Sequence, residues 1–433
     1  MMDRDSLTGR IKEGFHDMLY IWAYELKQVF KDEGVLIFFI LVPLLYPLLY
    51  SWAYNNEVVE NAPVVAVDHS HSSLSRDFLR RCDATQGIRI VSYAADMEEA
   101  KEVMRQQGAR GIIYIPNEFA QKINRMEQAS ISIYTDMSGI LYYKQILITA
   151  TNISLDMGAD LQIMKLGNYT EREDEVSTAP LKYADVPIFN PAGGYGSFLL
   201  PAVLMLILQQ TLVLGIGLSA GTARENSSHE QLIPISRHYN GIFRIVFGKS
   251  VCYFMIYAVV GAYLTMVIPH LFHFPQLLHL KDLIAIMIPY LLACIFFGMT
   301  LSAMVRYREN VILLIVFTSL PLLFLTGISW PGSAIPGAWK GISYLFPSTF
   351  GVNAFVKMNN MGALLNDVHF EYRALWLQTG LYFFTACAVY RHQIILSHKH
   401  YLANKLKKEQ EYRLSEQLDP DAQTMKSNTH NEK

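Results

Sequence analysis

The stretch SFLLPAVLMLILQQTLVLGIGLSA, residues 197–220, carries no charged side chain. A bilayer core is about 30 Å thick, so a helix needs roughly 20 consecutive apolar residues to cross it. This stretch meets that length without interruption. It therefore predicts a membrane-spanning helix and sets the class of the whole chain as an integral membrane protein.

Comparable stretches lie on both sides of it. Five segments are long and apolar enough to span: Val35–Tyr54, Ser197–Ala220, Ser250–Pro269, Leu283–Val305 and Val311–Trp330. A sixth, Ala374–Tyr390, is shorter but uncharged. Between the last two, Ile342–Val356 is apolar but contains Pro347 and Gly351, which predicts a re-entrant or interfacial piece. Charged residues make up only 17 % of the chain, against about a quarter in soluble domains.

Lysine and arginine are concentrated in the flanks that six spans would place on one side of the membrane. By the positive-inside rule, both termini are expected in the cytoplasm of a bacterial cell, at the inner membrane. The predicted domains are a cytoplasmic arm (1–34), a first span (35–54), an extracytoplasmic α/β domain (55–196), a domain of five spans (197–392) and a cytoplasmic tail (393–433). The polar arm is too long and the first apolar run too extended for a cleaved signal peptide.

The arm itself has an apolar stripe at helical spacing, which predicts an amphipathic helix. This helix would lie at the membrane interface or pack on the cytoplasmic ends of other spans, and both readings fit the pattern. The stripe consists of Phe15, Met18, Leu19, Trp22, Leu26, Val29 and Phe30.

Residues 63–167 alternate strand and helix signals, which predicts a mostly parallel sheet with crossover helices. The expected strands are Pro63–Val67, Ile88–Tyr93, Gly111–Ile115 and Ile131–Thr135. The expected helices are Ser73–Arg81, capped by Ser73 or Ser75, Met97–Gln107, capped by Asp96, Glu118–Met126, capped by Asn117, and Ile140–Leu166. The charged run Glu171–Glu175 reads as a solvated linker. The fold class is thus an α-helical membrane protein of about six spans with an inserted α/β domain.

Motifs for chemistry are weak in this chain. Asp68, His69 and His71 follow a strand and could hold a ligand, but a polar loop with a helix cap is favoured because no third ligand is apparent. Gly248-Lys249-Ser250 resembles the end of a phosphate-binding loop, yet Phe243 stands where the motif requires glycine. We therefore expect no catalytic residue, no metal and no cofactor in this chain.

Two amides lie in the middle of the second span. Gln209 and Gln210 are candidates for lining a translocation path, although bonding between neighbouring helices is the favoured alternative. The expected spans have no acidic or basic residue at mid-bilayer, which argues against a proton- or sodium-coupled transporter. The loop Gly221–Lys249 is short and charged, so it either presents a helix to a soluble partner or is a solvated connector.

This arrangement resembles the type-2 ATP-binding-cassette (ABC) permeases, in the subgroup with a large outside domain between the first two spans. The resemblance covers about residues 15–392. It is carried by Val64–Ser75, by Glu99-Ala100 with Gly111–Phe119, and by an outer loop containing Gly327–Pro331, Ile335-Pro336 and Phe346–Thr349.

The resemblance implies a permease subunit of an ATP-driven exporter that works as a dimer, with itself or a related permease, beside ABC ATPase subunits that bind the ATP. It implies a coupling loop that docks on the ATPase, and the matching residues here are Arg224, Glu225, Glu230, Gln231 and Leu232. A periplasmic adaptor protein is a further partner implied by the family, and no nucleic acid is expected. The alternative function is a membrane-anchored sensor that uses the extracytoplasmic domain as a receptor.

Overall fold

The computed structural model describes residues 7–166, 170–179, 181, 186–190, 193–225, 241–302 and 307–418. The chain forms two compact units. The helical unit is Met1–Asn55 with Gly196–Lys433, and the sheet unit is Asn56–Tyr195. Each unit has its own buried core.

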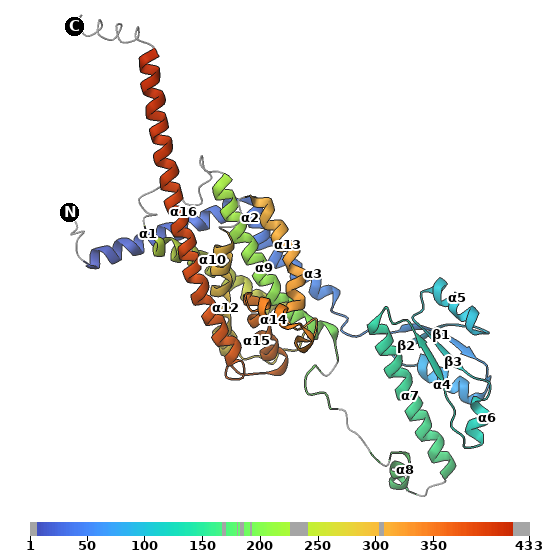
Figure 1. The fold of residues 1–433 in the computed structure, drawn as a ribbon. Helices are drawn as coiled ribbons and strands as arrows, with labels where there is room; N and C mark the ends of the chain where they lie inside the picture. The colour runs from blue at the N-terminus through green and yellow to red at the C-terminus, as the bar shows by residue number, and fades with distance from the viewer. Residues whose placement is uncertain are drawn as a thin grey trace, which may run out of the picture. The chain divides into compact units, whose positions relative to one another are not determined.

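The helical unit is a bundle of long helices (Figure 1). Its elements are α1 (Leu7–Lys31), α2 (Glu33–Leu36), η1 (Ile37–Leu41), α3 (Val42–Ala53), α9 (Tyr195–Glu225), α10 (Ile242–Ala262), η3 (Tyr263–Val267), α11 (Ile268–Leu271), α12 (Leu280–Leu301), α13 (Arg308–Leu325), η4 (Gly332–Ala334), α14 (Gly337–Ser343), α15 (Pro347–Met361) and α16 (His369–Leu418).

Five helical stretches among the described residues are long and apolar enough to cross a membrane. They are Glu33–Ala53, Tyr195–Glu225, Ile242–Leu271, Leu280–Leu301 and Arg308–Leu325. The expected sixth segment, Ala374–Tyr390, lies inside α16 and is not among these five. The chain is therefore a predominantly helical membrane protein, and the sixth span stays a prediction.

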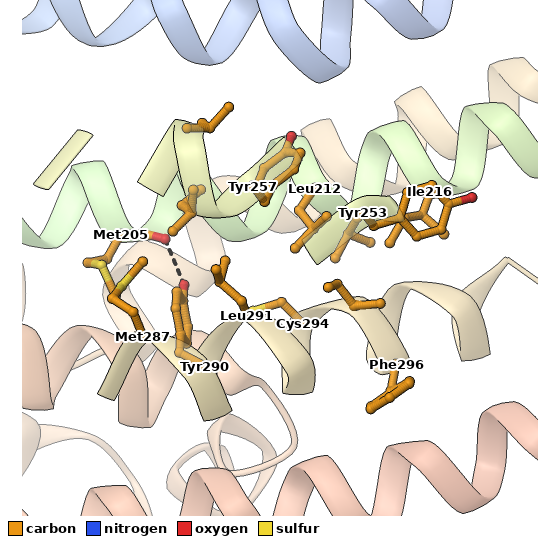
Figure 2. Close-up of a cluster of buried hydrophobic side chains, with 14 of the residues drawn as sticks. Met205, Leu212, Ile216, Tyr253, Tyr257, Met287, Tyr290, Leu291, Cys294 and Phe296 are labelled. Carbon is orange, nitrogen blue, oxygen red and sulfur yellow. Dashed lines mark hydrogen bonds between the residues drawn. The ribbon is translucent and has the colours of Figure 1, made fainter. Parts of the chain in front are cut away.

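Helix α9 lies at the centre of the bundle. The apolar stretch of α9 is buried along its whole length. This fits its sequence, because the helix is apolar around its entire circumference. Figure 2 shows Leu212 and Ile216 of α9 packed near Tyr253 of α10 and Cys294 of α12. On this face the hydroxyl of Tyr290 donates to the Met205 carbonyl at 2.7 Å, which joins α12 to α9.

Two spans contain a π-helical turn, and each turn ends just before a proline. The turn Ile37–Leu41 precedes Pro43, and the turn Tyr263–Val267 precedes Pro269. A proline has no N–H to donate to the preceding turn and its ring clashes there. A widened turn relieves the clash while the chain stays helical.

The segment expected to be re-entrant is two helices, α14 and α15. The break at Pro347 is confirmed, since α15 begins there. The break expected at Gly351 is wrong, because Gly351 is buried inside α15. A Cβ atom at that position would lie 2.3 Å from the Tyr290 ring, so this glycine serves close packing of α15 on α12.

The sheet unit has a four-stranded sheet with strand order β2-β1-β3-β4. Strands β1 and β2, and β1 and β3, pair in parallel, and β4 is antiparallel to β3. Its elements are β1 (Ala62–Asp68), α4 (Ser73–Asp83), β2 (Ile88–Tyr93), α5 (Met97–Gln107), β3 (Gly111–Ile115), α6 (Phe119–Asn124), β4 (Ser132–Thr135), α7 (Ile140–Leu166) and α8 (Glu171–Thr178).

Alternate residues of β1 enter two different cores. Val64 and Ala66 pack with side chains of α4, α6 and α7, whereas Val65 and Val67 pack with α5. The sheet therefore has helices on both faces (Figure 1), as parallel strands require.

Three local expectations in this unit need correction. Helix α4 is capped by Ser72, which forms a reciprocal capping box with Ser75. Helix α6 begins after Glu118, and no side chain caps it, so Asn117 is not its cap. The run Glu171–Glu175 is part of helix α8 rather than an extended linker, because Thr170 caps its first turn.

Candidate functional site

Buried charges gather where α1 packs against the rest of the helical unit. Glu25 of α1 is 3 % exposed and accepts from the Lys249 ammonium of α10 at 2.7 Å. The same carboxylate accepts the Tyr253 hydroxyl and, at 3.1 Å, the Ser219 hydroxyl of α9. One side chain of α1 thus bonds to both α9 and α10.

Burial disfavours the charged form of Glu25. The charge of Lys249 and the hydrogen bonds from Lys249, Tyr253 and Ser219 outweigh it, so the pKa of Glu25 lies below its ordinary value. The Glu25 carboxyl is therefore ionised at neutral pH. A buried pair of this kind costs about 3–5 kcal/mol when one partner is removed, because the other charge is left without compensation.

A second contact lies at the end of α1. Asp32 accepts the Thr222 hydroxyl of α9 at 2.6 Å and pairs with Arg308 of α13 at 2.8 Å. It also caps α2 by accepting the Val35 amide at 3.2 Å. Burial raises the pKa of Asp32, but these hydrogen bonds and the Arg308 charge hold it below its ordinary value.

A third contact lies nearer the start of α1. Asp17, which is 5 % exposed, pairs with Arg244 in the first turn of α10 at 2.5 Å. At helical spacing, Asp17 and Glu25 of α1 and Asp32, which directly follows α1, lie on one side of the helix. We call these three pairs and their hydroxyl partners the α1 clamp.

Gly248-Lys249-Ser250, which resembles the end of a phosphate-binding loop, lies where α10 contacts α1. A Cβ atom at Gly248 would lie 2.9 Å from Ile21 and 3.0 Å from the Met18 carbonyl, so glycine permits the close approach of α1. Lys249 is the partner of Glu25, and the Ser250 hydroxyl donates to the Phe247 carbonyl within its own helix. Gly248-Lys249-Ser250 is therefore the surface of α10 on which α1 packs.

The clamp borders the segment expected to dock on a partner. Of the five predicted docking residues, Arg224 and Glu225 end α9, whereas Glu230, Gln231 and Leu232 lie outside the described residues. Arg224 is 6 % exposed, and the Glu225 carboxylate accepts the Arg308 backbone N–H at 3.4 Å. The docking role of these residues stays a prediction.

Sequence reasoning did not identify the clamp. The arm was expected to be an amphipathic helix, and α1 is a helix whose buried side packs on α10. Phe15 and Phe30 on α1 are more than half exposed, and a place for α1 at the membrane interface stays a prediction. The signal that could have found the clamp is Glu25, an acidic residue that interrupts the apolar stripe between Trp22 and Val29.

The two mid-span glutamines have different surroundings. The Gln209 carbonyl accepts the Ser348 backbone N–H at 2.6 Å, and its amide donates to the Ser348 hydroxyl at 3.1 Å. Gln209 therefore caps the N-terminus of α15 from another helix, as the favoured alternative supposed. The Gln210 amide nitrogen is buried and has no partner among the described residues.

The polar residues after β1 are used locally. Asp68 accepts the backbone N–H groups of Ser70 and His71 and the Ser75 hydroxyl at 2.7 Å. These bonds fit a loop that leads into α4. Within the described part of the chain, no group of three or more His, Cys, Asp or Glu residues is placed to hold a metal ion.

The α1 clamp, the central α9 and the short helices α14 and α15 belong to one bundle of mostly apolar helices. A family model for the ABC-2 family transporter protein matches residues 34–388. This chain belongs to the ABC-2 transporter family. It is a transporter membrane subunit, and its family implies an ATPase partner.

Individual relatives of this ABC-2 chain are distant. The "Probable multidrug ABC transporter permease YbhR" of Escherichia coli (strain K12) is 19 % identical over 338 residues, which cover 77 % of this chain and 87 % of that protein. The protein of the same name from Escherichia coli O157:H7 matches to the same extent. Both relatives are named as probable permeases of multidrug ABC transporters.

Proposed function

We propose that this chain is the permease subunit of an ATP-driven exporter that moves substrate out of the cytoplasm or the inner membrane. ATP binds to a separate ABC ATPase subunit, which docks on the segment from Arg224 to Leu232. The observation that carries this proposal is the α1 clamp, because it fastens α1 to the helices on both sides of that segment.

The clamp supports a mechanical role for α1. Thr222 lies just before the docking segment and Arg244 just after it, and both bond to acidic residues of α1 or its end. Asp32 both ends α1 and caps the first span. A movement of the docking segment would therefore pull on α1 and, through Asp32, on the first span.

The direction of transport rests on topology. We place both termini in the cytoplasm of the bacterial inner membrane, so that the sheet unit is a periplasmic domain available to an adaptor protein of an efflux assembly. In this placement, α9, α10, α12 and α13 cross the membrane. The α1 clamp then lies at the cytoplasmic ends of the helices.

We further propose that the permease acts as a dimer with a second copy or a paralogue, with the path opening at their interface. Helix α13 offers a surface for such a contact, since Val316, Phe317 and Leu320 are each more than 60 % exposed. Gln209 is occupied in capping α15. Gln210 is the better candidate of the two for lining a path.

The test is purification of the full chain from native membranes in mild detergent, with mass spectrometry of co-purifying proteins. We expect an ABC ATPase with the wild type and at least fivefold less of it with a Glu230→Ala, Leu232→Ala variant. The control is Trp339→Ala, Lys340→Ala, two exposed positions of α14 near the far end of α13. Equal recovery from both variants would refute the docking site, and no ATPase with the wild type would refute the exporter.

A further inference from the structure

A groove of about 520 Å³ lies between α10, α12 and α16. This volume is within the roughly 300–1,000 Å³ typical of sites that take small molecules. It is separate from the α1 clamp, from Gln209 and from the exposed face of α13. Its lining is Phe247, Ser250, Val251, Phe254, Leu292, Phe296, Trp376, Thr379, Gly380 and Phe383.

The groove offers no charged group, and its two hydroxyls are already bonded to backbone. Ser250 donates to the Phe247 carbonyl at 3.1 Å, and Thr379 donates to the Leu375 carbonyl at 2.8 Å. A polar ligand would lose its own hydrogen bonds on entering such a site, which carries a large cost. Apart from the indole N–H of Trp376, the lining is apolar or already hydrogen-bonded, which favours an apolar ligand.

Three phenylalanine rings lie close together in the lining of the groove. The Phe383 ring lies 5.2 Å from the Phe296 ring and 5.4 Å from the Phe247 ring, centroid to centroid. Figure 2 shows Phe296 on the side of α12 that faces away from Leu212 and Tyr253 of the central core. The part of α12 that lines the groove at Phe296 is therefore on the side away from those core residues.

Gly380 borders the groove. A Cβ atom added at this position would meet no heavy atom within 4 Å, although the residue lies inside helix α16. Glycine costs a helix about 1 kcal/mol relative to alanine, and here it makes no close helix contact that would account for it. Because glycine has no side chain, this part of the groove is left unfilled.

The position of the groove indicates its occupant. The groove extends about 10 Å along α10, from Phe247 to Phe254. A single hydrocarbon chain fits, and both α10 and α12 belong to the membrane-spanning stretches.

We propose that this groove binds an acyl chain of a bilayer phospholipid, which fills the space over Gly380 and fastens α16 to α10 and α12. The proposal requires only that these helices lie in the membrane. It does not depend on the direction of transport or on the docking segment.

The test uses the purified full chain in vesicles of phosphatidylethanolamine and phosphatidylglycerol that contain a phosphatidylcholine with a photoreactive diazirine in one acyl chain. After irradiation, labelled peptides are quantified by mass spectrometry. We expect label at residues 247–254 and 376–383 to exceed label on the first span at residues 37–49 by at least fivefold. The first-span peptide is the reference because Ile37, Leu41, Leu45 and Leu49 are also exposed.

Variants then decide whether the groove holds the chain. Gly380→Trp, or the smaller Gly380→Leu, should lower the groove label at least fivefold while elution from a sizing column is unchanged. Leu377→Trp is the matched control, since Leu377 lies on the same helix, is 70 % exposed and does not line the groove. Even labelling of all lipid-facing peptides, or groove label that persists in both Gly380 variants, would overturn the proposal.

Discussion

At the scale of single residues, the clearest feature is the burial of Glu25 against Lys249. Both side chains are less than 10 % exposed, and their carboxylate and ammonium are 2.7 Å apart. Removing two charges from water costs free energy that offsets their attraction. We therefore expect the pair to fix the position of α1 on α10 more than it adds to the net free energy of unfolding. This is the contact through which we expect α1 to follow the rest of the bundle.

Glu25→Gln should lower the free energy of unfolding by about 3–5 kcal/mol, because Lys249 is left buried without a counter-charge. Lys249→Met should have a comparable effect, and the double variant should lose much less than the sum of the two. Denaturant titration in detergent micelles measures all three.

The control for this cycle is Glu98→Gln in the sheet unit. Glu98 pairs with Lys101 at 2.8 Å, but both side chains are at least half exposed. Such surface pairs contribute about 0–1 kcal/mol. Additive losses for Glu25 and Lys249 would show that the two charges do not act as a pair.

Gln209 and Gln210 form a natural comparison, because they are adjacent and chemically identical. Gln209→Leu should destabilise the helical unit by about 1–3 kcal/mol, since the buried Ser348 amide loses its acceptor. Gln210→Leu should be neutral or stabilising, since its amide nitrogen has no partner among the described residues. Thermal unfolding in detergent checks both, and an equal loss in the two variants would contradict the capping role.

At the scale of elements, the position of α9 depends on close approach by its neighbours. A Cβ atom at Gly215 would lie 1.6 Å from the Phe39 ring of the first span. No adjustment of the ring tip alone can absorb that overlap. The π-helical turn Ile37–Leu41 carries this phenylalanine, so the irregular turn and the glycine belong to one packing contact.

Gly215→Ala should therefore destabilise the bundle by about 1–3 kcal/mol through overpacking. Adding Phe39→Ala in the same chain should remove the overlap, so that the double variant loses less than Phe39→Ala and Gly215→Ala predict together. Gly158→Ala in α7 is the control, because nothing lies within 4 Å of the added atom and alanine favours the helix. A Gly215→Ala variant as stable as the wild type would refute this contact.

At the scale of the whole molecule, the chain consists of two units with separate cores. Among the described residues, the two clusters on the faces of the sheet consist of side chains of the sheet unit. We expect residues 56–195 expressed alone to be soluble and to unfold cooperatively. Circular dichroism during heating measures this.

The comparison for that fragment is Ile113→Asp, which places a carboxylate in a fully buried position of β3. A buried charge without a partner should abolish the cooperative transition. An aggregated wild-type fragment, or one without a thermal transition, would show that the sheet unit needs the rest of the chain to fold.

The sequence located elements well where the signal is local. The strands of the sheet unit and the helices Met97–Gln107 and Ile140–Leu166 lie where periodicity and caps placed them. Two of the three predicted caps, those of α4 and α6, and the break at Gly351 were wrong, because a neighbouring residue or a distant ring decided the outcome. The docking role of Glu230, Gln231 and Leu232 stays a prediction.

What the sequence by itself determined is the membrane class, the alternation of strands and helices, and the family, because hydropathy and turn residues act within a few positions of the chain. Only the tertiary structure decided that Glu25 meets Lys249, that Gln209 caps α15, and that Gly380 leaves a groove between three helices. These contacts join residues up to 224 positions apart. They depend on which helices become neighbours, and that is set by the packing of the whole bundle.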